Sequence, residues 1–279
     1  MVTDQETNKV YFSTWLTKLK CWQDIRMTLE QARVPYGLLE GTQDYWVRDF
    51  MPIQVTRNSY VQYVYNPDYL HTSPDYRTDG VACLERLCFP DSKVVKTDIV
   101  LDGGNVIKCD DSVIMTNKVF LENRQWSKAK VMDELERVFG AEVIIIPWDH
   151  HERYGHVDGM VRYLGDGRVL LTNYGDFAPE FAKELVKTLS HKYDVTELSY
   201  PLQKPSSYNW AYINYLQVGK VVLMPKLDDP ENDMAYEQLH NLFPDASICR
   251  VGGIKPLLRR GGGLKPSMSP LSSNDCRSS

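Results

Sequence analysis

One acidic side chain lies where an apolar one would be expected. In the segment 44–52, Asp49 stands between Val47 and Met51 at alternate positions, and alternate residues of an extended strand share a face. A carboxylate on an apolar face is costly unless it is paired, so Asp49 needs a partner. The structural alternative is an Asp that accepts backbone N–H bonds in the turn before Pro52, or that pairs with an Arg. Taken by itself, this motif favours the structural alternative.

A histidine and a second carboxylate come together in the segment 154–162. His156 and Asp158 are two residues apart, which places an imidazole and a carboxylate side by side on one face of a strand. Glycines on both sides leave room for a ligand. One alternative is a hydrogen-bonded surface pair, and another is a metal site that adds His150 and His151. The metal site is disfavoured because adjacent residues of an extended chain face opposite ways.

Three further segments become informative only together with these two. The run Asp102-Gly103-Gly104-Asn105 lies between two apolar runs and predicts a hairpin turn, whose glycines would let the backbone approach a ligand closely. Around Asn214, core packing and pocket lining explain the aromatic side chains equally well. No Gly-Lys-Ser/Thr sequence follows the glycines at 261–263, which excludes a phosphate-binding P-loop.

Short β-like runs alternate with helical patterns along the chain. Strands are expected at 60–65, 94–100, 113–115, 143–146, 169–171 and 221–224. Helices are expected at 14–32, 127–139, 179–193 and 232–242, with Ser127 as the N-cap of the second. Polar turns such as Gly165-Asp166-Gly167 predict hairpins between the helices, which argues against an all-parallel sheet. The sequence therefore predicts an α/β fold with mixed sheets and a repeated module.

Composition limits the class of protein. The chain has 279 residues, of which 43% are hydrophobic and 25% are charged, as is typical of one large domain or at most two. Its net charge is -5, and it lacks the dense cationic stripe that nucleic-acid binding requires. This charge agrees, weakly, with a cationic small-molecule ligand. The apolar runs are too short to span a bilayer and residues 1–9 show no signal peptide, so we expect no membrane partner and a cytoplasmic location.

The cysteines indicate neither a zinc site nor a disulfide framework. Six are present, none in a C-x-x-C pair, and a chain of this length does not need disulfides to fold. We expect no metal and no other cofactor. Packing is the expected role of five of them, Cys21, Cys83, Cys88, Cys109 and Cys249.

Taken in order, six motifs resemble the agmatine deiminase family, which is related to bacterial-type peptidylarginine deiminase. They are W-V-R-D-F-M-P, L-D-G-G-N, N-K-V-F-x-E-N, G-H-V-D-G-x-V-R, A-Y-I-N-Y and R-G-G-G-L, and they cover roughly residues 40–264. The resemblance implies the pentein fold, an α/β propeller of pseudo-fivefold ββαβ-like modules around a central active site. It also implies hydrolysis of a guanidino group, on agmatine or an arginine side chain, to a ureido group and ammonia.

The resemblance assigns the chemistry to three residues of this chain. Asp49 and Asp158 match the two carboxylates that would each take a pair of guanidinium N–H donors and hold the plane of the cation. A cysteine thiolate would then attack the central carbon and expel ammonia, and water would release the ureido product. His156 matches the general acid that protonates the departing amine and later activates the water.

Three more residues match positions that would contact the substrate. Trp46 corresponds to an aromatic wall on which the guanidinium or the aliphatic stem can stack. Asp102 and Asn214 fall in family motifs close to the pocket, and the resemblance implies substrate binding for both.

The resemblance ends where the family has its nucleophile. The family's cysteine would stand two residues after Leu264, where this chain has Pro266. Cys276 lies ten residues further on, and a flexible tail would not hold its thiol about 3–3.5 Å from the guanidinium carbon. We therefore expect a deiminase-family hydrolase whose activity is impaired. The alternative is a catalytically inactive relative that still binds cationic guanidines.

The composition changes abruptly at Lys265. The prediction is a single pentein deiminase domain over 1–264 and a disordered, Ser/Pro-rich tail over 265–279, in place of the family's cysteine-bearing segment. A reading-frame change or an alternative terminus would explain so sharp a boundary. The sequence is compatible with a homo-oligomer and does not specify one.

Overall fold

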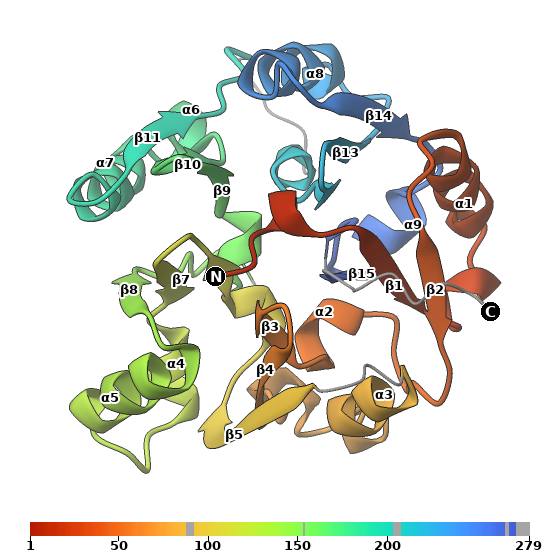
Figure 1. Cartoon of the computed structure of the whole chain (residues 1–279). Helices are drawn as coiled ribbons and strands as arrows, with labels where there is room; N and C mark the ends of the chain where they lie inside the picture. The colour runs from red at the N-terminus through yellow and green to blue at the C-terminus, as the bar shows by residue number, and fades with distance from the viewer. Residues whose placement is uncertain (88–91, 153, 203–207, 266–267, 272–279) are drawn as a thin grey trace.

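Five three-stranded sheets are arranged around a common centre (Figure 1). They are seen in a computed structural model that describes residues 1–87, 92–152, 154–202, 208–265 and 268–271. In each sheet the middle strand pairs antiparallel with one neighbour and parallel with the other. The predicted α/β fold with mixed sheets and a repeated module is confirmed.

Four of the sheets are each built from one continuous stretch of chain, which supplies a hairpin and then a parallel third strand. Their strands are β3 (Ile53–Thr56), β4 (Ser59–Val64) and β5 (Lys93–Val100); β6 (Ile107–Lys108), β7 (Ser112–Thr116) and β8 (Glu142–Ile146); β9 (Val161–Gly165), β10 (Arg168–Leu171) and β11 (Asp194–Glu197); and β12 (Leu216–Val218), β13 (Val221–Pro225) and β14 (Ser247–Val251). Every strand expected from the sequence is present.

A helical crossover joins the second strand of each module to the third, as a parallel pair requires. The crossover helices of these four modules are, in chain order, α3 (Gly80–Arg86); α4 (Lys118–Glu122) and α5 (Lys128–Phe139); α6 (Tyr174–Phe177) and α7 (Pro179–Leu189); and α8 (Glu231–Leu242). These helices lie on the outside of the ring (Figure 1). A short helix, α9 (Lys255–Leu258), follows the last module.

Helix α5 shows how local sequence sets an element. Its N-cap Ser127 accepts a hydrogen bond from the backbone N–H of Lys130 at 3.2 Å, and Gly140 ends the helix in a left-handed conformation with φ 61°. Val131 and Leu135, four residues apart, are fully buried on one face. The predicted helix and its N-cap are confirmed.

The fifth sheet joins the two ends of the chain. Strand β1 (Lys9–Ser13) pairs in parallel with β2 (Tyr36–Leu39), across helix α1 (Cys21–Gln31), and antiparallel with β15 (Met268–Leu271). Strand β15 lies inside the segment 265–279, for which the composition predicts a disordered tail, and it pairs with β1 through backbone hydrogen bonds. The prediction for the tail stays untested. Residues 266, 267 and 272–279 lie outside the described residues, so the prediction for Pro266 and Cys276 stays untested.

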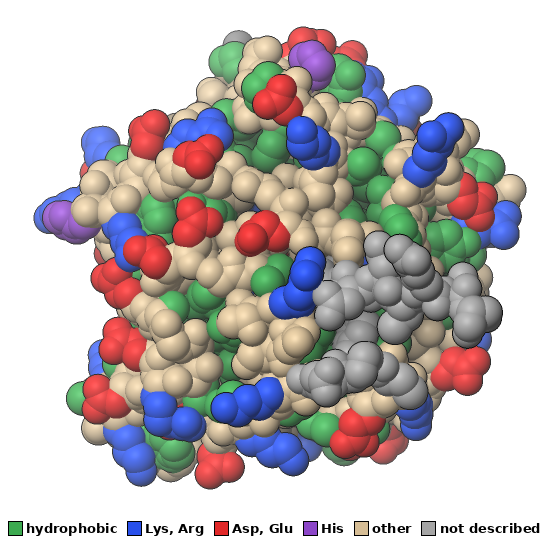
Figure 2. Space-filling model, in the orientation of Figure 1, with side chains coloured by type: hydrophobic (Ala, Val, Ile, Leu, Met, Phe, Trp, Pro, Cys, Tyr) green, Lys and Arg blue, Asp and Glu red, His purple; other side chains and the backbone are tan. Residues whose placement is uncertain are grey.

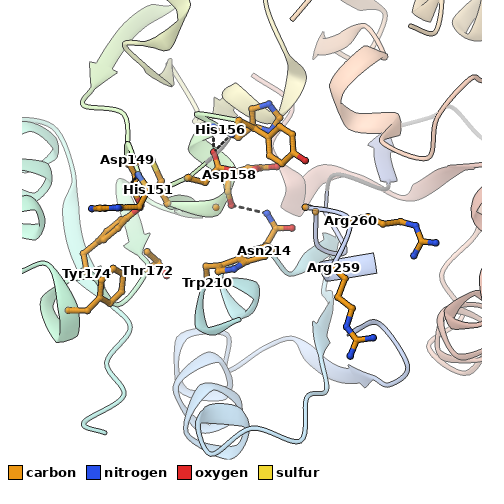
Figure 3. Close-up of a pocket in the computed structure, with 17 residues that line it drawn as sticks. Asp149, His151, His156, Asp158, Thr172, Tyr174, Trp210, Asn214, Arg259 and Arg260 are labelled. Atoms are coloured by element: carbon orange, nitrogen blue, oxygen red, sulfur yellow. Dashed lines mark hydrogen bonds between the residues drawn. The ribbon is translucent and has the colours of Figure 1, made fainter. Parts of the chain in front are cut away.

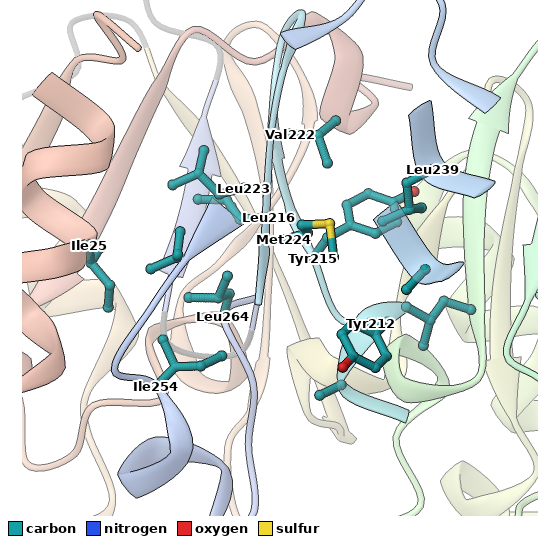
Figure 4. Close-up of a cluster of buried hydrophobic side chains, with 14 of the residues drawn as sticks. Ile25, Tyr212, Tyr215, Leu216, Val222, Leu223, Met224, Leu239, Ile254 and Leu264 are labelled. Atoms are coloured by element: carbon teal, nitrogen blue, oxygen red, sulfur yellow. The ribbon is translucent and has the colours of Figure 1, made fainter. Parts of the chain in front are cut away.

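The largest hydrophobic cluster of the described residues packs the β1–β2 sheet and α1 against the module of β12, β13 and β14 (Figure 4). Ile25 of α1 belongs to the same buried cluster as Leu223 of β13, Ile254 and Leu264. Leu264 is fully buried, so the chain is held in the core up to the residue before Lys265.

Three short turns at the centre carry the motif residues. They are α2 (Val47–Phe50), and the 3-10 turns η5 (Gly103–Asn105) and η6 (Val157–Gly159). The expected geometry was wrong for each of the three, since a strand was expected for 44–52 and 154–162 and a hairpin for 101–106. In the structure α2 contacts η5, and η5 contacts η6. The conformation of these turns depends on contacts between distant segments, which the alternation of side chains in one segment cannot predict.

The surface agrees with the absence of a cationic stripe in the sequence. On the face shown in Figure 2, Lys and Arg side chains are interspersed with Asp and Glu. Among the helices of the described ranges, none is both long and apolar enough to cross a membrane.

Candidate active site

Two cavities meet at the motif residues. The larger has a volume of about 570 Å³ and is lined by Asp158, His156 and Asn214 among others (Figure 3). The smaller has a volume of about 320 Å³, and its lining includes Trp46, Asp49 and again His156. Because His156 lies in both walls, a ligand seated beside it could extend into either cavity.

The imidazole of His156 is enclosed by carboxylates. Its Nε2 lies 2.9 Å from Oδ2 of Asp102, and its Nδ1 lies 3.9 Å from Oδ1 of Asp49. Burial by itself would lower the pKa of His156, but Asp49, Asp102 and Asp158 outweigh burial and raise it above its usual value. The ring is therefore held as an imidazolium, which is the form that can donate a proton.

Asp49 is held from a distant part of the chain. Its Oδ1 accepts a hydrogen bond from the backbone N–H of Gly104 at 3.0 Å. The structural alternative for Asp49 was a backbone N–H donor in the turn before Pro52. The observed donor is also a backbone N–H, but it belongs to η5. Arg48 does not pair with Asp49, because its guanidinium donates to the carbonyl oxygens of Gly103 and Val106. Burial raises the pKa of Asp49 above its usual range, and the nearby imidazolium of His156 offsets this rise only in part.

Asp158 is a buried residue in the lining of the larger cavity. The residue is 2% exposed, and its buried Oδ2 has no hydrogen-bond partner in the described part of the chain. A buried carboxylate oxygen without a donor is costly, and a cation in the cavity would remove that cost.

The predicted substrate-binding residues Asp102 and Asn214 are both buried at the site, and each hydrogen-bonds to another part of the protein, although Oδ1 of Asp102 has no partner within the described ranges. Asp102 hydrogen-bonds to His156 and so orients its ring. Asn214 donates to the backbone carbonyl of Asp158 at 3.3 Å, and its Oδ1 accepts from the backbone N–H of Lys265 at 3.3 Å (Figure 3). Asn214 thereby ties the Asp158 turn to the residue before position 266. Substrate contact by either residue stays a prediction.

Trp46 forms part of the wall of the smaller cavity. Its ring packs against the backbone at Gly262, where an added Cβ would lie 2.6 Å from ring atom Cη2. Tyr45 meets the ring edge-on, with centroids 5.3 Å apart. The ring is half-buried and in place for stacking before any ligand arrives.

Two groups of functional importance had no signal in the sequence. One is the pair of rings beside His156, where the centroid of Tyr154 lies 5.7 Å and that of Tyr69 lies 6.2 Å from the imidazole. The other is Glu152, whose Oε2 accepts from the backbone N–H groups of Tyr154, Gly155 and His156. Glu152 therefore fixes the loop that carries His156.

A cluster of buried charges lies beneath the site. Asp4 enters it from the N-terminal segment, and its Oδ2 lies 2.7 Å from Nη2 of Arg162 and 3.7 Å from Nζ of Lys265. The guanidinium of Arg162 stacks on the ring of Tyr215 at 4.2 Å. No motif marked Asp4, which lies more than 150 residues from Arg162 in the sequence.

Neither cavity is lined by a cysteine within the described ranges. Cys21, Cys83, Cys109 and Cys249 are free thiols elsewhere in the fold. Burial raises the pKa of Cys109 to about 12, which makes it unreactive. Likewise, those ranges contain no cluster of three or more His, Cys, Asp or Glu side chains that could hold a metal ion. The site can bind a planar cation and move a proton, and a thiol would have to come from residues beyond those described.

Comparison with known sequences decides the family. The sequence model described as Porphyromonas-type peptidyl-arginine deiminase matches residues 13–267. The chain belongs to this family. Among curated relatives, putative agmatine deiminase 2 of Listeria monocytogenes is 24% identical over 220 residues, 64% of this chain and 58% of the relative. Putative agmatine deiminase 1 of the same species is 27% identical over 274 residues, 79% of this chain and 73% of the relative.

Solved structures of relatives share the fold over almost the whole chain. An agmatine deiminase from C. jejuni with substrate bound has a TM-score of 0.76 at 17% identity, over 98% of this chain and 96% of that one. A Pseudomonas aeruginosa DDAH complexed with citrulline has a TM-score of 0.62 at 14% identity, over 95% of this chain and 99% of that one. The predicted pentein fold is confirmed.

A glycine in η5 makes the compact arrangement around His156 possible. An added Cβ at Gly104 would lie 2.7 Å from Oδ1 of Asp49 and closer still to Nδ1 of His156. We expect Gly104→Ala to cost about 1–3 kcal/mol of stability through overpacking. Because Asp49 must move, we also expect the affinity for the guanidine ligand proposed below to fall more than tenfold, measured by calorimetry. Gly252→Ala is the control, since nothing lies within 4 Å of its added Cβ, and an equal loss of binding in that variant would contradict the assignment.

Proposed function

We propose that this chain binds the guanidinium group of a small cationic ligand between Asp49 and Asp158. The observation that carries the proposal is the buried Oδ2 of Asp158, which has no partner within the described ranges and belongs to a residue in the lining of the larger cavity. A guanidinium offers five N–H donors in one plane, enough for a bidentate bond to each of two carboxylates. Its charge would also compensate Asp49, whose pKa is raised by burial.

The roles of the neighbouring side chains follow from the family chemistry. His156, oriented by Asp102, would protonate the departing ammonia and then accept a proton from the attacking water. Trp46 would stack against the ligand. The C–N bond would break only after a thiolate had added to the guanidinium carbon, and position 266 is Pro in this chain. We therefore propose that ligand binding is retained and that hydrolysis to a ureido product is impaired.

The proposed ligands are agmatine and the arginine side chain of a peptide. The relatives above include agmatine deiminases, and the combined cavities have room for either ligand. A cytoplasmic location and a homo-oligomer remain predictions from the sequence.

Binding and turnover can be separated by experiment. Calorimetry with agmatine and with an arginyl peptide should detect binding of at least one of them, while a colorimetric ureido assay should detect little or no product. Absence of binding by both ligands would overturn the proposed site, whereas rapid ureido formation would overturn the proposed impairment.

Restoring the thiol tests the cause of the impairment. We expect Pro266→Cys to raise the rate of ureido formation from agmatine at least about 100-fold over the parent, since a covalent step becomes available. Lys265 is left unchanged in this variant because it is buried beside Asp4. His156→Ala in the same background should remove the gain. No gain with agmatine still bound would mean that the missing thiol is not the sole defect.

A further inference from the structure

Lys118 is a buried cation close to the candidate site. It begins helix α4 and belongs to the N-K-V-F-x-E-N motif over 117–123, whose residues are all described and line neither cavity. Its side chain is 2% exposed, and a buried ammonium is costly unless polar groups surround it. The partners of Lys118 therefore decide what this motif does in the fold.

The ammonium group of Lys118 joins three segments of the chain. Its Nζ donates to the backbone carbonyl oxygen of Tyr154 at 2.6 Å. It also lies 3.1 Å from Oδ1 of Asp68 and 3.3 Å from Oε1 of Glu122. The centroid of the Tyr69 ring is 5.0 Å from Nζ, which is within the range of a cation–π contact. Lys118 thereby links α4 to the segments around residues 69 and 154.

Those two segments supply the rings beside His156. The centroids of Tyr69 and Tyr154 are 4.9 Å apart, and they lie 6.2 Å and 5.7 Å from the centroid of the imidazole. All three residues line the smaller cavity. Oδ1 of Asp68 also accepts the backbone N–H of Tyr69 at 2.8 Å, so one carboxylate oxygen connects Tyr69 to Lys118.

The aliphatic stem of Lys118 contacts the other segment. Gly155 lies between Tyr154 and His156, and an added Cβ there would overlap Cδ of Lys118. The ammonium and the methylene groups of one side chain therefore contact consecutive residues of the loop that carries His156. A shift of Lys118 would move this loop.

Glu122 is a buried counter-ion of Lys118. Its side chain is 5% exposed. Burial raises the pKa of Glu122 to about 7, and the cation of Lys118 opposes that rise. Removal of Lys118 alone would leave Glu122 without this cation, whereas removal of both charges would not. The stability of the fold and the placement of the rings can therefore be tested separately.

We propose that Lys118 is a positioning residue for the candidate site, because it holds Tyr69 and Tyr154 against His156 and so sets the shape of the smaller cavity. Its effect on guanidine binding rests on the proposed function. The arrangement of the three rings does not, and it can be measured without a ligand.

Lys118→Met removes the ammonium and keeps a stem of similar length. We expect the Kd for agmatine, measured by calorimetry on the full chain, to rise about tenfold or more because the rings are no longer fixed. We also expect the NMR signal of His156 Hε1 to shift toward its position in Tyr69→Leu, because the shielding from a neighbouring ring changes with its distance. The signal is assigned by its absence from His156→Ala.

An exposed lysine provides the matched control. Lys183→Met removes the ion pair with Glu180 on α7, in which both side chains are exposed. It should change neither the Kd nor the His156 signal.

A double variant separates positioning from stability. Lys118→Met should lower the melting temperature because Glu122 loses a cation, and adding Glu122→Gln should recover most of that loss. The double variant should still bind agmatine weakly and keep the shifted His156 signal. If the single variant fails to fold, the double variant carries the comparison.

The outcomes distinguish this inference from the proposed function. Recovery of both the parent affinity and the parent His156 signal in the double variant would show that Lys118 acts through stability alone, and would overturn the inference. So would an unshifted signal, or a Kd equal to that of the parent, in folded Lys118→Met. Failure of the parent chain to bind agmatine would overturn the proposed function, and the His156 signal would still decide the role of Lys118.

Discussion

Asp158→Asn is expected to remove most of the affinity for guanidines while leaving the protein as stable as before, or more stable. The change replaces the unpaired carboxylate oxygen with an amide that cannot match the ligand's charge. Loss of one partner of a buried charge pair costs about 2–5 kcal/mol, which corresponds to a rise in Kd of about 30-fold or more. In the free protein the same change replaces a carboxylate whose buried Oδ2 has no hydrogen-bond partner within the described ranges. Calorimetry with agmatine gives the Kd, and a denaturant titration gives the free energy of unfolding.

Asp166→Asn is the matched control for this variant. Asp166 is exposed in the turn between β9 and β10 and has a positive φ of 51°, which Asn tolerates. It should change neither the Kd nor the free energy of unfolding. If Asp158→Asn bound agmatine as tightly as the parent, the guanidinium could not be held by Asp158.

Asp4→Asn is expected to have the largest effect on stability, a loss of about 3 kcal/mol in the free energy of unfolding. Asp4 is the carboxylate paired with the buried Arg162, and without it the guanidinium loses its charge partner. Equilibrium urea unfolding at pH 7 measures the difference. Asp245→Asn, an exposed substitution, is the control and should change the free energy by less than about 0.5 kcal/mol.

The pH dependence of this effect has a definite sign. Although burial alone would raise the pKa of Asp4, the cations Lys265 and Arg162 hold it well below its usual value. A carboxyl with a lowered folded-state pKa stabilises the fold above its unfolded pKa of about 3.9, and this contribution is lost as the pH falls below that value. The difference between parent and Asp4→Asn should therefore be constant from about pH 5 to 7 and shrink below about pH 4. A difference that grew in acid would contradict the pairing.

Local patterns were reliable where neighbours in the sequence set the structure. The N-cap Ser127 could be predicted because its hydrogen-bond partner, Lys130, is only three residues away. Strand β13 could be predicted because it is a short, continuous apolar run. The candidate site was predicted in part, since Asp49, His156 and Asp158 do lie around adjoining cavities. Their identification depended on motif order across the chain, because each motif alone favoured a simple turn or pair.

The roles that the sequence missed all depend on contacts between distant segments. Asp102 was expected to bind substrate, which stays a prediction, and its hydrogen bond to His156, 54 residues away, had no signal in the sequence. Asp4 had no motif, yet it neutralises Arg162 and approaches Lys265. A carboxylate's role depends on which cation or donor lies within about 4 Å, and only the closed ring of modules sets that distance.

The sequence by itself determined the module type, most of the elements, the family motifs and the proline at position 266, because all of these are properties of short stretches and their order. The tertiary structure decided which acidic residues line a cavity, as Asp49 and Asp158 do, and which pair with a protein cation, as Asp4 does with Arg162. It also paired β15 with β1, so that the chain's last described strand completes its first sheet. Burial and pairing arise only when segments far apart in the chain meet, and the energy of a charged side chain depends on them far more than on its neighbours in sequence.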